Sequence, residues 1–178
     1  MSKSTKLIGL TGPTGAGKTT VADLFRKQGI YVVDCDKVAR EVIQVADRSK
    51  TAETVFSDRK KLEEFNKTNF PKIISAVDKL IEGQKIAVID ASQLFESGYD
   101  KKCDYIISVI ANDDTRLSRI IKRDKITKEQ AVLRMKSQLS AEFFRKNSNL
   151  VIDNSTDNLG ENDILSAEDI SKILENVK

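Results

Sequence analysis

The chain has 178 residues, enough for one domain with a well-formed core and too few for two ordinary domains. A composition of 39% hydrophobic and 32% charged residues is typical of a globular protein, and no apolar run approaches the length of a transmembrane helix. The 30 Lys and Arg residues nearly balance the 27 Asp and Glu residues, which suits local anion-binding sites better than a continuous surface for nucleic acid.

The absence of one residue type restricts the chemistry further. The sequence has no His, so a His-containing nucleophile triad and a His general base are excluded, and proton transfer falls to a carboxylate, Lys, Tyr or Cys. Cys35 and Cys103 form no C-x-x-C pair, and we expect both to be small core or near-site residues. Residues 1–6 lead straight into the first predicted strand and leave no room for a signal peptide, so we expect a cytoplasmic protein without a membrane partner.

A Gly-rich segment near the N-terminus fits the pattern G-x-x-x-x-G-K-[ST] over residues 12–19. It lies between an apolar run at residues 6–10, which predicts a buried strand, and an amphipathic helix that begins at Thr19 and stops at Gly29. Glycines let the backbone turn its N–H groups inward toward phosphate oxygens, Lys18 then reaches the β- and γ-phosphates, and the Thr19 hydroxyl ligates Mg²⁺. We therefore predict a nucleotide-binding loop. Its predicted binding residues are Gly12, Gly15, Ala16, Gly17, Lys18, Thr19 and Thr20.

Two carboxylates follow the second predicted strand, over residues 30–33. Asp34 and Asp36 come directly after it, at the edge of an open α/β sheet where ligands bind. Asp36 also suits the N-cap of a helix over residues 37–43. We expect a catalytic or Mg²⁺-linked role for at least one of the two carboxylates, and the pattern leaves open which one is the base.

The middle of the chain is helical and polar up to a third strand. We expect Pro71 to start a helix whose apolar spacing continues to residue 81. The apolar run 86–89 then ends in Asp90, a Walker B pattern that places a carboxylate to hold Mg²⁺ beside Thr19, directly or through water.

The segment from residue 113 to residue 145 carries nine Lys and Arg residues and predicts a lid. It follows a strand over residues 104–110, and Asn112 offers an N-cap for its first helix. Thr127 and Gln130 form a capping box that starts a second helix. Arg119 and Arg123 lie four residues apart, so both can approach one anion. An exposed helix pair held by salt bridges is the alternative.

The chain closes with a strand over residues 150–153, then Asn154, a polar loop and a helix capped near Ser166. We expect one domain over residues 1–178.

These segments together resemble the dephospho-CoA kinase family over nearly the whole chain. The matching blocks are the phosphate loop at residues 8–21, the D-x-D segment with a trailing Arg at 34–40, the central segments 47–48 and 55–58, residues 90–98 against the family's D-x-P-L-L-F-E-x-G, the lid segment 119–124, and Gln138 with 151–154 against Q…V-I-x-N.

The resemblance implies a three-layer α/β P-loop kinase fold with a five-stranded parallel sheet, a helical lid at about 113–146 and a shortened helical substrate subdomain at about 37–83. It implies transfer of the γ-phosphoryl group of ATP, with Mg²⁺, to the ribose 3′-hydroxyl of dephospho-CoA. Asp36 would be the base or orienter, Lys18 with Mg²⁺ and Arg123 with Arg119 would neutralise the transferring group, and Asn154 would lie near the adenine. Asp34, Asp36 and Arg40 would face the acceptor.

The sequence also departs from the family on the acceptor side. Phe70 replaces a His, Ser92-Gln93 replaces Pro-Leu, and a stretch common in the family is missing between residues 42 and 47. Two alternatives therefore stay open: another P-loop kinase of a nucleoside-type small molecule, or a degenerate relative that only binds nucleotide. We expect small-molecule substrates, no nucleic acid, and a monomer or small homo-oligomer.

Overall fold

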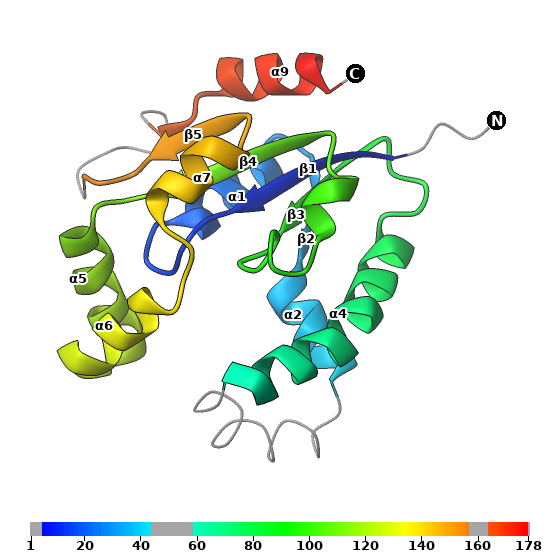
Figure 1. Cartoon of the computed structure of the whole chain (residues 1–178). Coiled ribbons are helices and arrows are strands. Elements are labelled where there is room, and N and C mark those ends of the chain that lie inside the picture. The colour runs from blue at the N-terminus through cyan, green and yellow to red at the C-terminus, as the bar shows by residue number, and fades with distance from the viewer. Residues whose placement is uncertain (1–4, 44–58, 157–163, 178) are drawn as a thin grey trace.

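A five-stranded parallel sheet forms the centre of the computed structural model, which describes residues 5–43, 59–156 and 164–177 (Figure 1). The strands are β1 (Lys6–Thr11), β2 (Tyr31–Asp34), β3 (Ile86–Asp90), β4 (Tyr105–Ile110) and β5 (Leu150–Asp153). They lie in the order β2-β3-β1-β4-β5. The five predicted strands are confirmed, because short apolar runs buried on both faces are typical of parallel sheets.

The described helices are α1 (Lys18–Lys27), α2 (Cys35–Val42), α4 (Arg59–Leu80), the short 3₁₀ helix η1 (Tyr99–Lys102), α5 (Asp113–Asp124), α6 (Lys128–Lys136), α7 (Ala141–Asn147) and α9 (Ala167–Asn176). No helix among the described residues is both long enough and apolar enough to cross a membrane. The segments at residues 47–48 and 55–58, which are part of the resemblance, lie outside the described residues.

Two hydrophobic cores lie on opposite faces of the sheet and give the three layers. On one face, Phe25 of α1 and Ile170 of α9 pack against strand residues such as Ile8. On the other face, Val77 of α4 packs with Leu94 from the segment after β3. Burial of these apolar faces is the main force that holds the helices to the sheet.

Local signals placed several helix ends correctly. Asn112 caps α5, the Thr127–Gln130 capping box starts α6, and Ser166 caps α9. Gly29 follows α1 with φ 74°, a left-handed conformation that glycine adopts without a steric penalty.

Two local predictions are wrong. Pro71 lies inside α4 and does not start it. Its missing N–H leaves the carbonyl of Lys67 without a helical partner, but both residues are exposed, so water can bond that carbonyl. The apolar side chains that follow, such as Ile73 and Val77, pack in the core and hold the helix in place.

The second correction concerns the cap of α2. Asp34, and not Asp36, is the N-cap: its carboxylate accepts the backbone N–H of Lys37 at 2.9 Å. The helix begins one residue after β2 ends, so the first carboxylate takes the capping position. Asp36 therefore lies in the first turn of α2 with its carboxylate available for other contacts.

Candidate active site

The carboxyl ends of three strands bring the predicted loop and carboxylates together. Asp90 is in register with Leu10 of β1 and with Asp34 of β2. The phosphate loop follows β1, so it leaves the sheet beside both carboxylates. Figure 1 shows the lid helices α5 and α6 on one side of this edge and α2 and α4 on the other.

The phosphate loop has the backbone that its glycines permit. Gly12, Gly15 and Gly17 have φ of 145°, 79° and 94°, a region that other residues rarely adopt. A Cβ on Gly12 would lie 2.1 Å from the carbonyl oxygen of Val109. The loop leads into the N-terminus of α1, where unpaired N–H groups and the helix dipole favour an anion.

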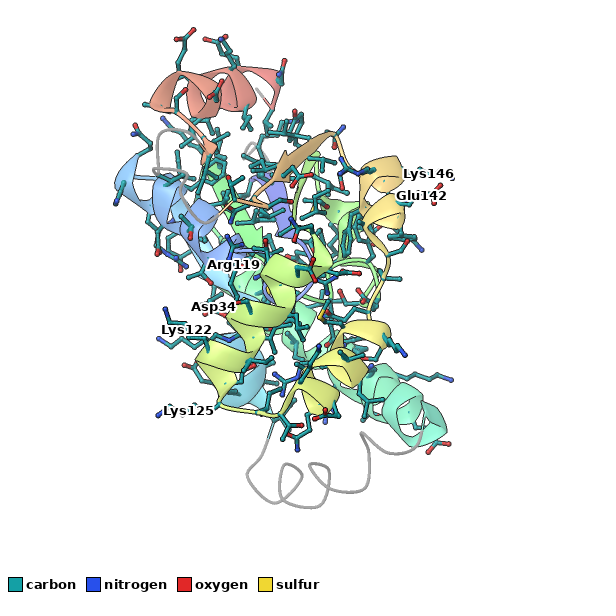
Figure 2. All side chains as sticks on the ribbon, turned by 90° about the vertical axis from the view of Figure 1, so that its left-hand side faces the viewer. Asp34, Arg119, Lys122, Lys125, Glu142 and Lys146 are labelled. Atoms are coloured by element: carbon teal, nitrogen blue, oxygen red, sulfur yellow. The ribbon has the colours of Figure 1, made fainter. Side chains whose placement is uncertain are left out.

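Asn154 and Arg119 hold this loop from the side of β5 and α5. The buried Asn154 amide donates to the carbonyl of Ala16 at 2.9 Å. Arg119 donates to the carbonyl oxygens of Asn154 at 3.0 Å and Gly15 at 3.3 Å. Figure 2 shows Arg119 in the middle of α5, with Lys122 further along the helix and Lys125 directly after its last residue.

Thr14 at the top of the loop is bonded through three different groups to the lid. Its N–H donates to the Gln138 side-chain oxygen at 3.1 Å, and its carbonyl accepts Arg116 Nε at 3.0 Å. Its hydroxyl accepts Arg123 at 3.1 Å. Arg116 also donates to Gln138 at 3.0 Å, so the four residues form one network.

Sequence reasoning missed Arg116 and Gln138 as loop partners. Arg116 is only 6% exposed, whereas most Lys and Arg residues of the lid are not buried. Nothing in the local sequence distinguishes it from the other cations, because its burial arises from the packing of α5 against the loop.

Lys18 forms an ion pair with Asp90 beneath the loop. Their side chains are 15% and 8% exposed. Burial raises the pKa of Asp90 above its ordinary value, and the charge and hydrogen bond of Lys18 oppose that effect.

A cavity of about 800 Å³ opens over the loop. Its wall includes most of the loop, Thr19, Asp36, Ser92, Arg119, Lys122, Arg123, Arg134 and Gln138. The structure thus brings Lys18, Thr19, Asp36, Arg119 and Arg123 around one space, as the sequence predicts. In this space Asp36 accepts a hydrogen bond from the Ser92 hydroxyl at 3.0 Å.

The remaining predicted site residues do not line this cavity. Asp34 is engaged as the helix cap, Asp90 lies under Lys18, and Asn154 lies behind the loop. The side chain of Ala16 is buried, and the N–H of Thr20 donates to the Gly17 carbonyl. Arg40 is exposed on α2.

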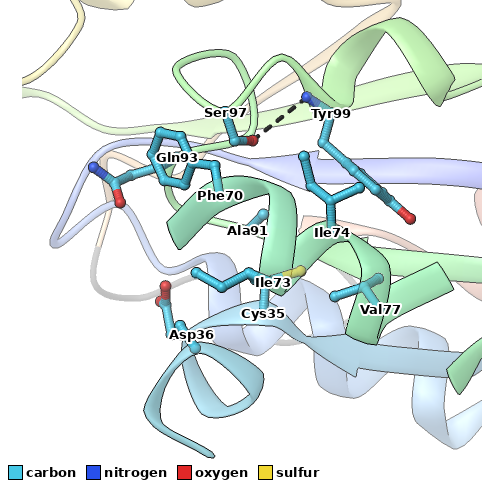
Figure 3. Close-up of a pocket in the computed structure, with 11 residues that line it drawn as sticks. Cys35, Asp36, Phe70, Ile73, Ile74, Val77, Ala91, Gln93, Ser97 and Tyr99 are labelled. Atoms are coloured by element: carbon cyan, nitrogen blue, oxygen red, sulfur yellow. Dashed lines mark hydrogen bonds between the residues drawn. The ribbon is translucent and has the colours of Figure 1, made fainter. Parts of the chain in front are cut away.

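A second, smaller pocket of about 50 Å³ adjoins the first at Asp36. Its wall is mostly apolar and comes from α2, α4 and the segment after β3. Figure 3 shows Asp36 and Gln93 at one end of this pocket and Tyr99 and Val77 at the other. Phe70, one of the departures noted in the resemblance, is part of this wall.

The lid contains both of the features that the sequence left as alternatives. Asp124 pairs with Arg123 and Arg134, which is the salt-bridged arrangement, and these pairs lower the pKa of Asp124. Yet Arg123 and Arg134 both also line the cavity. The ion pairs therefore hold cations at the site.

The donor atoms near the loop fit a hard divalent cation. No group of three His, Cys, Asp or Glu side chains that could hold a metal occurs among the described residues. Mg²⁺ commonly takes one or two protein oxygens and completes its shell with water and substrate phosphates. The Thr19 hydroxyl and the Asp90 carboxylate supply oxygens of that kind beside the phosphate loop.

Fold and site together define a P-loop kinase. Solved structures with this fold include TT1252 from Thermus thermophilus, with a TM-score of 0.82, 24% identity and coverage of 99% of this chain and 100% of that one. A dephospho-CoA kinase from Campylobacter jejuni has a TM-score of 0.63 at 20% identity, with 96% of each chain covered. A shikimate kinase from Acinetobacter baumannii has a TM-score of 0.62 at 18% identity, with 97% and 95% covered.

The family model described as dephospho-CoA kinase matches residues 6–48 and 45–159. A dephospho-CoA kinase from Fusobacterium nucleatum is 37% identical over 176 residues, which cover 86% of this chain and 91% of that one. The enzyme of that name from Oryza sativa is 34% identical over 177 residues, covering 84% and 77%. The chain belongs to the dephospho-CoA kinase family.

Proposed function

We propose that this protein transfers the γ-phosphoryl group of ATP to the 3′-hydroxyl of the ribose of dephospho-CoA, giving coenzyme A and ADP in the last step of coenzyme A synthesis. The observation that carries the proposal is the position of Asp36, whose carboxylate lines the same cavity as the phosphate loop and Lys18. A kinase needs a proton acceptor for the attacking hydroxyl across from the donor phosphates, and this arrangement supplies one.

In the proposed reaction, the site has a group for the proton that is released and groups for the negative charge that develops on the transferring phosphoryl group. The 3′-oxygen attacks the γ-phosphorus, the bond to the β-phosphate breaks, and its electron pair leaves with ADP. Asp36 accepts the proton of the hydroxyl late in the reaction. Lys18 and the loop N–H groups stabilise the charge on the transferring group.

The lid cations complete the electrostatic environment. Arg123 and Arg119 reach the cavity from α5, and closure of the lid would bring them onto the same phosphoryl oxygens. Mg²⁺, held by Thr19 and Asp90, would neutralise the β- and γ-phosphate charge when bound. Asn154 stays a predicted nucleotide-binding residue, and its bond to Ala16 supports a role through the loop.

The two carboxylates after β2 have different roles in this proposal. Asp34 caps α2 and so fixes the helix that carries Asp36. Asp36 is the base, with Arg40 kept as an acceptor-side residue on the same helix. The substrate side spans about residues 37–83, the lid about 113–146, and both belong to one domain that acts in the cytoplasm on small molecules.

The direct test is to incubate the protein with MgATP and dephospho-CoA and to detect coenzyme A by mass. We expect coenzyme A and ADP in equal amounts. ADP without coenzyme A would contradict the acceptor and keep the kinase class, whereas nucleotide binding without turnover on any acceptor would indicate a binding protein.

The residues that line the small pocket favour a second candidate acceptor, a nucleoside or nucleotide. Phe70 and Gln93 are departures from the family pattern in the resemblance, and they line the same small pocket as Asp36, the proposed base. A panel of nucleosides, nucleotides and dephospho-CoA, compared by kcat/KM, tests this candidate. A nucleoside preferred over dephospho-CoA would replace the proposed acceptor.

A further inference from the structure

Ser92 forms a hydrogen bond with Asp36 that connects two distant parts of the chain. The hydroxyl donates to Asp36 Oδ1 at 3.0 Å across 56 positions of sequence. Ser92 is partly buried and Asp36 is exposed, so packing alone does not select one rotamer of the carboxylate. Within the described residues, Ser92 supplies the one hydrogen bond to the Asp36 carboxylate.

The backbone that carries Ser92 is anchored to the phosphate loop strand. The N–H of Ala91 donates to the carbonyl of Leu10 at 3.0 Å, two residues before the loop begins at Gly12. On the other side, Leu94 is fully buried in the core. The position of the Ser92 hydroxyl is therefore set relative to the same strand that positions the nucleotide phosphates.

Asp36, in contrast, belongs to α2, which packs mainly on β2, β3 and α4. Without the Ser92 bond, the direction of its carboxylate relative to the phosphate loop would depend on the position of α2 and on the rotation of the side chain. The bond ties the Asp36 carboxylate to the backbone after β3, which is itself bonded to β1. The bond is made to Oδ1, so within the described residues Oδ2 has both lone pairs available to a substrate hydroxyl.

We propose that Ser92 is a positioning residue that orients the Asp36 carboxylate toward the acceptor hydroxyl. This role rests on the proposed function of Asp36 as the base. Phosphoryl transfer depends strongly on the alignment of the attacking oxygen, so loss of the orienting bond lowers the rate more than it weakens binding.

Gln93, the next residue in the chain, faces a different cavity from Ser92. Ser92 faces the large cavity, whereas Gln93 lines the small apolar pocket, and Asp36 borders both spaces. A change at residue 92 should therefore alter the base, and a change at residue 93 should alter the pocket beside it.

Three single substitutions test the role in turnover. Ser92→Ala removes the hydroxyl, Ser92→Thr keeps it, and Ser171→Ala is a matched control because the Ser171 hydroxyl donates locally to the Ala167 carbonyl on α9. For Ser92→Ala we expect kcat to fall about tenfold, as for loss of one hydrogen bond to a charged group, while the KM for the acceptor and the Kd for ATP change by less than about twofold. Ser92→Thr should recover most of kcat, and Ser171→Ala should stay near wild type.

A readout without substrate separates this proposal from the proposed function. Three-bond NMR couplings report the χ1 rotamer of Asp36 in the free protein. We expect one dominant rotamer in wild type and in Ser92→Thr, and rotamer averaging in Ser92→Ala. If wild type makes no coenzyme A, the proposed function fails, and the couplings still decide whether Ser92 orients Asp36.

Two results would overturn the role of Ser92. One is the same Asp36 rotamer distribution in wild type and Ser92→Ala. The other is an active wild-type enzyme whose kcat is unchanged by Ser92→Ala or is not recovered by Ser92→Thr.

Discussion

Lys18 of the phosphate loop is paired with Asp90 at the end of β3, and both side chains are almost removed from solvent. The carboxylate of Asp90 is therefore in contact with the cation that the proposed reaction needs at the γ-phosphate. In that reaction Lys18 would turn toward the phosphates of ATP, which would leave Asp90 available to Mg²⁺.

Lys18→Ala should lower kcat by about two orders of magnitude or more, because it removes charge stabilisation at the transferring phosphoryl group. Steady-state turnover with MgATP measures the effect. Lys146→Ala is the control, since that lysine is 72% exposed on α7 and pairs with Glu142. Turnover of Lys18→Ala close to wild type would contradict the role given to the loop lysine.

Asp36→Asn should retain ATP binding and lose most of the turnover, because an amide cannot accept the proton of the acceptor hydroxyl. Asp34→Asn should retain much of its activity, since Asn is as good an N-cap as Asp. Turnover assays, together with calorimetric titration of nucleotide with and without Mg²⁺, distinguish loss of the base from loss of a metal ligand. If Asp36→Asn weakened only the affinity for Mg²⁺, Asp36 would be a metal ligand and Asp34 the candidate base.

Gly17→Ala should destabilise the fold more than Gly29→Ala, although both glycines have positive φ. A Cβ on Gly17 would lie 2.2 Å from the buried Asn154 amide, whereas one on Gly29 would meet nothing within 4 Å. We expect a loss of about 1 kcal/mol of unfolding free energy for Gly29→Ala, from the left-handed backbone alone, and at least about twice that for Gly17→Ala. Urea unfolding measures both, and equal losses would contradict the contact with Asn154.

The strands and several caps were predictable because their signals are local. An apolar run ending in Asp specifies a buried strand and the side chain at its end, and Thr127 with Gln130 specifies a helix start within four residues. The prediction at Pro71 was wrong because the preference of proline for the first turn of a helix is a weak local signal. The packing of α4 on either side of Pro71 outweighs it.

The contacts that assemble the site were not predictable for the opposite reason. Ser92 meets Asp36 only because β2 and β3 are neighbours in the sheet, and Arg116 is buried only because α5 packs on Thr14. Each contact joins residues more than fifty positions apart. Helix α7 was missed because seven residues give too few turns for a clear apolar period.

Arg116→Met should lower the unfolding free energy by about 1–3 kcal/mol, because the Thr14 carbonyl and the Gln138 side chain each lose a donor in a nearly buried place. Affinity for ATP should fall as well, since Thr14 belongs to the phosphate loop. Arg26→Met on α1 is the control: its pair with Asp23 is exposed, and such pairs contribute little. An unchanged melting temperature and ATP affinity for Arg116→Met would contradict the network at Thr14.

The two thiols should react slowly in the folded protein. Burial raises the pKa of Cys35 and of Cys103 from 9.0 to about 12, so at pH 8 only about one thiol in ten thousand is the reactive thiolate. Reaction with Ellman's reagent should accelerate by about two orders of magnitude or more when urea unfolds the chain, and Cys103→Ser lets Cys35 be followed alone. Because the fold favours the protonated thiols, their contribution to stability is complete below pH 9 and is lost as pH rises toward 12. The unfolding free energy should therefore decline across that range, and fast labelling of folded Cys35 at pH 8 would contradict the raised pKa of its partly buried thiol.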